Sequence, residues 1–247
     1  LTHSNTYVSA GNTLSLTSGS DTNLKGAMAS GKQVVADVGG DLNLESLQDS
    51  SSYKSKQSSS SVGLSLCIPP FCYGISGSVA TNQQNINSDY LSVTEQTGIK
   101  AGYGGFQIKT AGNTDLKGAV IASTDKAVTD NRNSLTTGTL THSDIANRSD
   151  ASASSSGLTL SSDMLTQGKY GVAKGIIGNA IDHGEASASD SGATRSVVSA
   201  GEIHITDDAR QKLLTGRTAA DSVASLNRDT VNAHTAVDKQ DVHSLQK

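Results

Sequence analysis

Apolar and polar residues alternate along the first part of this chain in short runs that recur at a fixed spacing. The run Val8–Thr17 returns twenty residues later, in similar form, as Met28–Asp37. Gly19–Leu24 returns at the same spacing as Gly39–Leu44. In each unit a Gly, Asn or Asp corner precedes alternating apolar and polar residues, a pattern typical of a turn followed by a half-buried strand. The spacing therefore predicts short strands joined by tight corners.

Longer repeats enclose this short period. An apolar-x-Ala-Gly step occurs at Val8–Gly11, Ile99–Gly102 and Val198–Gly201, so cassettes begin about 91 and 99 residues apart. Thr22–Ala27 returns in the second cassette as Thr114–Ala119. Such a unit cannot bury its apolar face alone and needs neighbours stacked on it. We therefore predict a mainly β fold, a right-handed parallel β-helix with coils of about 20 residues.

Two Ser-rich excursions interrupt the cassettes, at about residues 46–98 and 143–197. Ser58–Leu66 in the first is similar to Ser154–Leu160 in the second, so both are repeated parts and not linkers. In the first excursion, alternating apolar residues stand on both sides of a Pro-Pro-Phe turn, which predicts a β-hairpin. The apolar positions are Val62, Leu64, Leu66 and Ile68 before the turn, Phe71 within it, and Tyr73, Ile75 and Val79 after it.

The sequence changes character near Thr206. Thr206 is a candidate helix cap, acidic residues behind it suit a first helical turn, and Gly216 suits the helix end. Further helices are predicted over about 218–227 and 230–245, although apolar residues there are sparse. We predict that residues 207–247 form a helical cap or connector.

Composition supports a thin core. Only 34% of the 247 residues are hydrophobic and 3% are aromatic, with no Trp, so a compact core of ordinary thickness is hard to build. The net charge of −4 argues against nucleic acid as a partner, because phosphate binding needs a basic face. The chain starts at Leu1 without a signal peptide, and we expect it to be a segment of a longer protein.

A family resemblance lies in the second cassette. Ile99–Ser123, followed by Asn133–Ile145, resembles the haemagglutinin repeat of filamentous haemagglutinin-like exoproteins. These are very large surface proteins of Gram-negative bacteria, exported by two-partner secretion. Within that family the chain is most similar to the later repeat region of contact-dependent growth inhibition proteins, upstream of the pretoxin and toxin regions. The resemblance covers about residues 1–206 and ends where the third cassette departs from the pattern.

The resemblance implies a secreted protein on the bacterial cell surface, outside the Gram-negative outer membrane. It implies an outer-membrane secretion partner for the full-length protein, and a target-cell outer membrane or surface receptor as the other partner, with this segment monomeric. With it, the repeats divide the chain into cassettes at 1–45, 99–142 and a partial 198–206, excursions at 46–98 and 143–197, and a connector at 207–247 that leads to a downstream pretoxin region.

Two cysteines, Cys67 and Cys72, flank the predicted hairpin turn. In a protein that resembles an exported one, such a pair is interpreted as a disulfide, closing a loop that contributes on the order of 2 kcal/mol. Zinc binding is the alternative, but no second Cys/His pair stands at suitable spacing. A redox pair needs two residues between the cysteines and here there are four.

No charged residue occurs from Ser58 through Ser88. Strands that meet lipid on one side can alternate apolar residues with Ser or Gly, so one hypothesis is a membrane- or receptor-contacting hairpin formed by the eight apolar positions given above. The other hypothesis is a hairpin that lies against the solenoid. Lys169 and Lys174 in the second excursion weaken the membrane hypothesis.

No pattern in the sequence indicates catalytic, cofactor-binding or metal-binding residues, and we expect the segment not to be an enzyme. A polysaccharide-processing β-helix would need acidic and aromatic residues on one face, and the chain has 2 Phe, 6 Tyr and no Trp. Two function classes remain: a segment that presents or delivers a C-terminal toxin to target bacteria, and an adhesin segment for attachment to host or bacterial surfaces.

Overall fold

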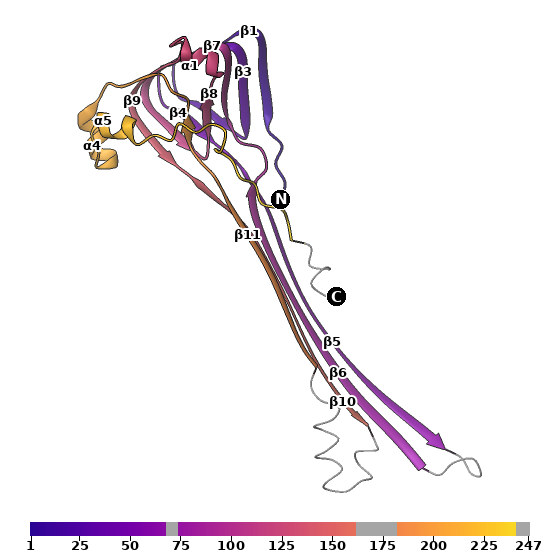
Figure 1. Cartoon of the computed structure of the whole chain (residues 1–247). Coiled ribbons are helices and arrows are strands. Elements are labelled where there is room, and N and C mark those ends of the chain that lie inside the picture. Colours follow the sequence, from indigo (N-terminus) through magenta and orange to yellow (C-terminus); the bar gives the residue numbers. More distant parts are fainter. Residues whose placement is uncertain (68–73, 162–181, 241–247) are drawn as a thin grey trace. The chain divides into compact units, whose positions relative to one another are not determined.

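The computed structural model describes residues 1–67, 74–161 and 182–240, and these are mainly β (Figure 1). The strands are β1 (Thr6–Ser18), β2 (Thr22–Lys25), β3 (Ala27–Val38), β4 (Leu42–Glu45), β5 (Gln48–Cys67), β6 (Gly74–Val93), β7 (Gly98–Lys117), β8 (Val120–Ala122), β9 (Ser134–Ser143), β10 (Ile145–Ser161), β11 (Asp182–Thr194), β12 (Val197–Val198) and β13 (Glu202–Ile205). The helices are α1 (Asp125–Thr129), α4 (Asp208–Thr215) and α5 (Ala219–Ala224).

The chain separates into two compact units. The first contains Leu1–Ser50, Leu91–Arg148 and Ser191–Asp238, and the second contains Ser51–Tyr90, Ser149–Asp190 and the remaining residues from Lys239. The first unit holds a nine-stranded sheet and the helices, and most of a four-stranded sheet lies in the second. Strands β5, β6, β10 and β11 begin or end in the first unit, at a region that we call the root.

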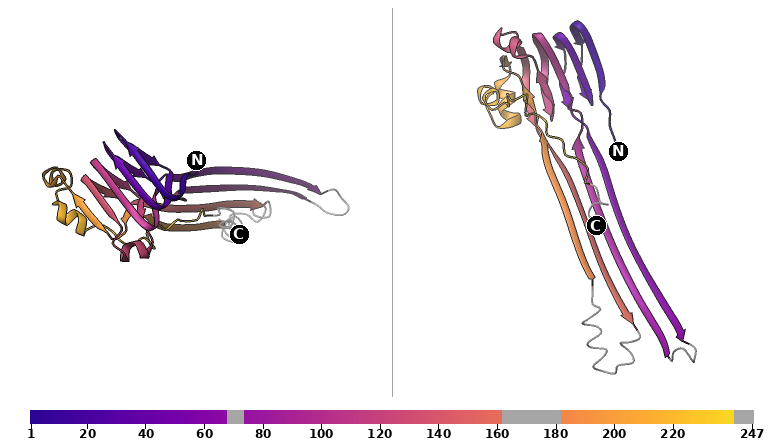
Figure 2. Two further views of the ribbon diagram at one scale, coloured as in Figure 1. Left: turned by 90° about the horizontal axis from the view of Figure 1, so that it is seen from above. Right: turned by 45° about the vertical axis from the view of Figure 1, so that its right-hand side comes forward.

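The nine-stranded sheet is parallel wherever its strands pair. β1 pairs with β3, β3 with β7, and β7 with β9, and the strands of this sheet lie side by side in Figure 2. In each of these pairings the register shifts at one corner. Beyond the corner, β2 pairs with β4 and β4 with the end of β7, so β7 takes part in more than one face of the curled sheet. Residues twenty apart are partners in the first cassette, as in Thr22 and Leu42. A curled parallel sheet confirms the predicted mainly β, parallel class and is consistent with a β-helix.

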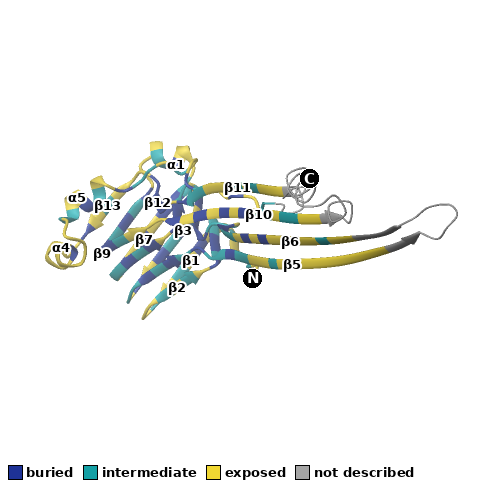
Figure 3. Ribbon diagram, turned by 90° about the horizontal axis from the view of Figure 1, so that it is seen from below, coloured by how far each residue is buried: buried dark blue, intermediate teal, exposed yellow. Residues whose placement is uncertain are grey.

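Alternation in sequence becomes a buried row and an exposed row. Leu42 and Leu44 of β4 are buried, and the residue between them, Asn43, is half-buried and donates its side-chain amide to the Oδ1 of Asn23 at 2.9 Å. Buried and more exposed positions alternate along the strands of the sheet (Figure 3). The parallel register repeats this arrangement in every layer. The rows of the core include Leu14, Val34 and Phe106 on one face, and Leu24, Leu44 and Leu116 on another.

The repeated Leu-Lys-Gly-Ala motif has a backbone reason. Gly26 has φ +58° and Gly118 has φ +56°, a conformation that Gly adopts without strain. Space is limiting as well, because a Cβ on Gly118 would lie 2.7 Å from the Cδ1 of Ile145, and one on Gly26 would lie 2.7 Å from the Cδ1 of Leu47. Gly26 therefore marks the tight corner between β2 and β3, and Gly118 marks the one between β7 and β8.

The C-terminal helices differ in part from the prediction. The cap of α4 is Asp207, whose Oδ1 accepts the backbone N–H of Arg210 at 2.9 Å, so the assignment of the cap to Thr206 was wrong by one residue. Gly216 ends α4 with φ +74°, and α5 lies within the predicted 218–227. The helix predicted over 230–245 is absent from its described part, 230–240.

The reason is a pairing in the root. The backbone N–H of Thr235 donates to the carbonyl of Ala193 at 2.9 Å, and that of Arg195 donates to the carbonyl of Ala233 at 2.7 Å. The tail therefore lies extended along the edge of β11. A sparse apolar pattern gives little helix stability in isolation, so the edge hydrogen bonds decide the conformation.

Gln211 of α4 substitutes for a strand at the end of the sheet. Its side chain is fully buried, its Oε1 accepts the N–H of Leu140 at 2.8 Å, and its Nε2 donates to the carbonyl of Leu140 at 2.8 Å. Nε2 also donates to the Oγ of Ser222 at 2.9 Å, which ties α5 to the same point. One amide thus satisfies both backbone groups that a further strand would otherwise satisfy.

We expect Gln211→Leu to destabilise the first unit by about 1–3 kcal/mol, because a buried N–H and a buried carbonyl lose their partners. Arg210→Ala on the exposed side of α4 is the matched control and should change stability by less than about 0.5 kcal/mol. Urea unfolding followed by circular dichroism measures both. Equal midpoints for the two variants would contradict the capping role of Gln211.

Candidate interaction site at the root of the excursions

The structure describes only part of the predicted hairpin site. Val62 and Leu64 lie on β5 with 71% and 78% of their surface exposed, and Val79 on β6 is 43% exposed. The other predicted contact positions and the predicted disulfide lie outside the residues or side chains that the structure describes: Leu66, Cys67, Ile68, Phe71, Cys72, Tyr73 and Ile75. The described apolar side chains of this hairpin are thus available at the surface.

The second unit has a polar face. Its sheet has the order β11–β10–β6–β5, and a shallow hollow of about 310 Å³ lies on β6, β10 and β11. The hollow is lined by Asn87, Asp89, Asp150, Ala151, Ser152, Ser187, Ala188 and Ser189. Within the described ranges no three His, Cys, Asp or Glu side chains come together as metal ligands. The lining offers hydroxyl, amide and carboxylate groups for hydrogen bonding.

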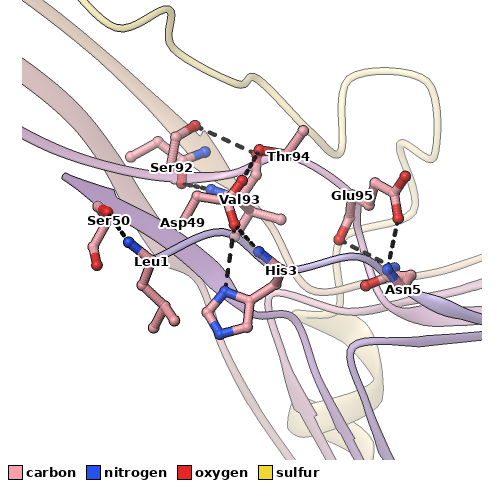
Figure 4. Close-up of polar contacts among 10 residues, drawn as sticks. Leu1, His3, Asn5, Asp49, Ser50, Ser92, Val93, Thr94 and Glu95 are labelled. Atoms are coloured by element: carbon pink, nitrogen blue, oxygen red, sulfur yellow. Dashed lines mark hydrogen bonds and ion pairs between the residues drawn. The ribbon is translucent and has the colours of Figure 1, made fainter.

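The root in the first unit holds a denser set of polar contacts. Asp49, at the start of β5, is 8% exposed, and its Oδ1 accepts the backbone N–H of His3 at 2.6 Å (Figure 4). Its Oδ2 accepts the hydroxyl of Thr94 at 2.6 Å. The carboxylate thus joins three chain segments: the N-terminal residues, the outgoing β5 and the segment that follows β6.

Burial raises the pKa of Asp49, but the hydrogen bond from Thr94 and those from the backbone and side chain of His3 outweigh it, so the pKa lies below its ordinary value. The His3 Nδ1 lies 3.3 Å from Oδ1 and forms an ion pair only when the imidazole is protonated. A hydrogen-bonded carboxylate of this kind stabilises the root while it is ionised.

Asn147 plays the corresponding part in the second excursion. Its Oδ1 accepts the N–H of Val93 at 2.9 Å, while its Nδ2 donates to the Oγ1 of Thr194 at 3.0 Å and to the carbonyl of Thr235 at 2.8 Å. Asn147 is 1% exposed. It stands four residues after the end of β9, as Asp49 stands four residues after the end of β4.

A second row of contacts runs beside these two residues. Asn5 donates its Nδ2 to the carbonyl of Gln96 at 3.4 Å, and Gln96 donates its Nε2 to the carbonyl of Arg195 at 2.9 Å. Arg195 donates its Nη1 to the carbonyl of Asn232 at 3.2 Å. The three residues follow the cassette spacing of about 91 and 99, so one contact is repeated in each layer.

Sequence reasoning missed these root residues. The available signal was an Asp four residues after β4 and an Asn four residues after β9. Asp and Asn are frequent in this chain, so the signal does not stand out. The arrangement anchors and aligns strands through fixed hydrogen bonds. None of the helices that the structure describes is long and apolar enough to cross a membrane.

Comparison with known proteins agrees with the repeat pattern. The family model for the hemagglutinin repeat matches residues 1–62. A protein of Escherichia coli named Toxin CdiA is 40% identical over 243 residues, which are 96% of this chain and 7% of that protein. This chain is a haemagglutinin-repeat region of the kind found in CdiA proteins. The resemblance predicted from the second cassette is confirmed.

Further relatives carry other names over a similar region. A tRNA nuclease CdiA of Escherichia coli (strain NC101) is 39% identical over 94% of this chain and 7% of its own length. A deoxyribonuclease CdiA of Dickeya dadantii (strain 3937) is 47% identical over 66% of this chain and 5% of its own length. This haemagglutinin-repeat region thus spans 5–7% of these three CdiA proteins. No solved structure is significantly similar to it.

We expect the first unit to lose stability as the pH falls through the lowered pKa of Asp49. Since the folded-state pKa lies below that of the unfolded chain, about 3.9, the contribution of Asp49 is present above that pH and is lost below it. Asp49→Asn places at position 49 the uncharged amide that Asn147 carries, and it should remove this part of the acid sensitivity. Asp49→Ala should cost about 1–3 kcal/mol at pH 7.

Thermal unfolding at pH 7, 4 and 3 distinguishes these variants. The midpoint of Asp49→Asn should fall less with acid than that of the unchanged chain. An identical fall in both would show that Asp49 does not govern the acid response of the root.

Proposed function

We propose that this chain is a non-catalytic repeat segment of a large secreted bacterial surface exoprotein, and that it helps present or deliver a C-terminal toxin in contact-dependent growth inhibition. The supporting observation is the similarity of 94–96% of the chain to proteins named Toxin CdiA and tRNA nuclease CdiA. Relatives whose names state different activities share this one region. A region shared by proteins with different activities supports a function that all of them need before the toxic reaction takes place.

The fold suits a supporting role. We infer a right-handed parallel β-helix with coils of about 20 residues, supported by the parallel partners Thr22 and Leu42 and by the corner glycines. The cassettes 1–45, 99–142 and 198–206 are its coils, and residues 207–247 are its cap or the connector to a pretoxin region. The supporting observation for a cap is the paired amide of Gln211 at the end of the sheet.

The excursion 46–98 is the part that we propose contacts the target-cell outer membrane or a surface receptor. Support comes from the exposed Val62 and Leu64, and from the absence of charge from Ser58 through Ser88. An Arg or Lys on a lipid-facing strand costs about 2–4 kcal/mol near the bilayer centre, and an Asp or Glu costs less, so a strand free of charge suits that surface. A disulfide between Cys67 and Cys72 would fix the turn between the strands, in keeping with export to an oxidising compartment.

Secretion to the cell surface through an outer-membrane partner follows from the same family relationship. Attachment is the second candidate function, because the matching family model is described as a hemagglutinin repeat. In that case the exposed hairpin residues serve binding to a host or bacterial surface and take no part in toxin delivery.

A substitution pair tests delivery in a full-length exoprotein that carries this segment. We expect Val62→Asp with Leu64→Asp to reduce target-cell killing at least tenfold, because two charges are introduced at the proposed contact. The matched control, Val62→Ser with Leu64→Ser, keeps the surface uncharged and should retain most of the killing. Surface display and cell-to-cell attachment are measured in parallel.

The outcome also separates the two functions. Loss of attachment together with killing in the Asp pair supports the adhesin function. Undiminished killing by the Asp pair at normal surface display would contradict a contact between this hairpin and the target membrane.

A further inference from the structure

The residues at the start of the chain occupy a place that recurs in each cassette. Val8 and Ile99 begin equivalent steps 91 residues apart, so Leu1 corresponds to Ser92 and Asn5 to Gln96. The contacts agree with this correspondence. Asn5 donates to the carbonyl of Gln96 as Gln96 donates to that of Arg195, one layer further on. Residues 1–5 thus lie where β6 ends in the next cassette, at the end of a returning strand.

The pairing of these residues is also the pairing found between the two excursions. Leu1 exchanges two backbone hydrogen bonds with Ser50 of β5, at 2.7 and 2.9 Å. In the next layer β6, the returning strand of the first excursion, is the sheet neighbour of β10, the outgoing strand of the second. Asp49 accepts the N–H of His3 and Asn147 accepts the N–H of Val93, which lies one residue before the counterpart of His3 at the spacing of 91. A returning strand therefore pairs with the outgoing strand of the next excursion in both places.

Leu1 lies beside β5 at Ser50, close to the start of that strand. Within the described residues β5 is an outer strand of its sheet, and residues 56–64 are all exposed. An outer strand presents a row of free backbone groups that favours another strand. The opposite outer strand, β11, is already covered at the root by the hydrogen bonds of Thr235 and Ala233.

We propose that the edge of β5 from Ser52 to Leu64 is a docking site for a β6-type returning strand from another excursion of this repeat. Successive excursions then form one continuous antiparallel sheet that grows by two strands for each cassette. The tail at 233–235 ends this sheet on the side of β11. Recognition is by main-chain hydrogen bonds, with the polar Ser-rich surface of the edge setting a preference for strands of like composition.

Successive residues of β5 direct their backbone N–H and carbonyl groups to opposite sides of the strand, which decides which residues can pair with a docked strand. Because the N–H and carbonyl of Ser50 face Leu1, the backbone groups of the even-numbered residues, Ser58 among them, face the open edge, and those of odd-numbered residues face β6. At the spacing of 91 Leu1 matches Ser92, so we assign the even-numbered N–H groups of a docked β6-type strand to the side that faces β5. A peptide of residues 78–90 would lie against Ser52–Leu64 without displacing residues 1–5.

The test uses the full chain and a fluorescent synthetic peptide with the sequence of residues 78–90. We expect saturable binding by fluorescence anisotropy, and at least tenfold weaker binding when the peptide carries N-methyl groups at Gln84 and Ile86. The matched peptide, N-methylated at Asn85 and Asn87, directs its methyl groups away from β5 and should bind like the unmodified one. A peptide of scrambled order should not bind.

A variant of the chain gives the reciprocal measurement. Ser58→Pro removes an N–H that faces the open edge, where Pro is tolerated, and should weaken peptide binding at least tenfold, whereas Ser58→Ala should leave it unchanged. Far-UV circular dichroism checks that both variants are folded. Absence of saturable binding to the folded chain would overturn the proposal, as would equal binding of the two N-methylated peptides.

Discussion

The stacking of apolar strands in parallel register is the interaction on which the rest of this structure depends. Leu44 is fully buried because Leu24 lies on one side of it and Leu116 on the other. Leu24, in the outermost layer, is only half-buried. Each layer thus gains its burial, worth about 25 cal/mol per Å² of apolar surface, from its neighbours and not from itself. A fold of this kind can therefore be lengthened by repetition, and the backbone groups at its ends need hydrogen-bond partners from outside the parallel sheet.

Side-chain amides and carboxylates provide these hydrogen-bond partners here. Gln211 satisfies both backbone groups of Leu140 where no further strand follows in the described chain. At the root, Asp49 and Asn147 receive backbone N–H groups from the preceding layer, where strands leave the parallel sheet. A buried backbone group without a partner is costly, so each departure from the regular sheet carries a polar side chain at a fixed place.

The parallel sheet and the excursions differ in what they expose. The parallel sheet is held by rows of small and medium apolar side chains and by repeated polar contacts, and it offers a scaffold whose layers are nearly equivalent. The excursions carry the exposed apolar residues Val62 and Leu64 and the open edge of β5. Similarity to differently named CdiA proteins extends over 94–96% of the chain, so the scaffold and the excursions are both parts of the shared region.

The sequence by itself determined the strands, their parallel class and the family, because these follow from alternation and from repeats that are visible along the chain. Gly216 was likewise predicted as a helix end. The tertiary structure alone decided the α4 cap at Asp207, the extended tail at 233–235 and the root contacts of Asn5, Gln96 and Arg195. Those contacts join residues about 90 to 100 positions apart, and which backbone groups need partners depends on which layers meet. Local preference, such as the weak helical pattern of residues 230–240, yields where an unpaired strand edge offers hydrogen bonds.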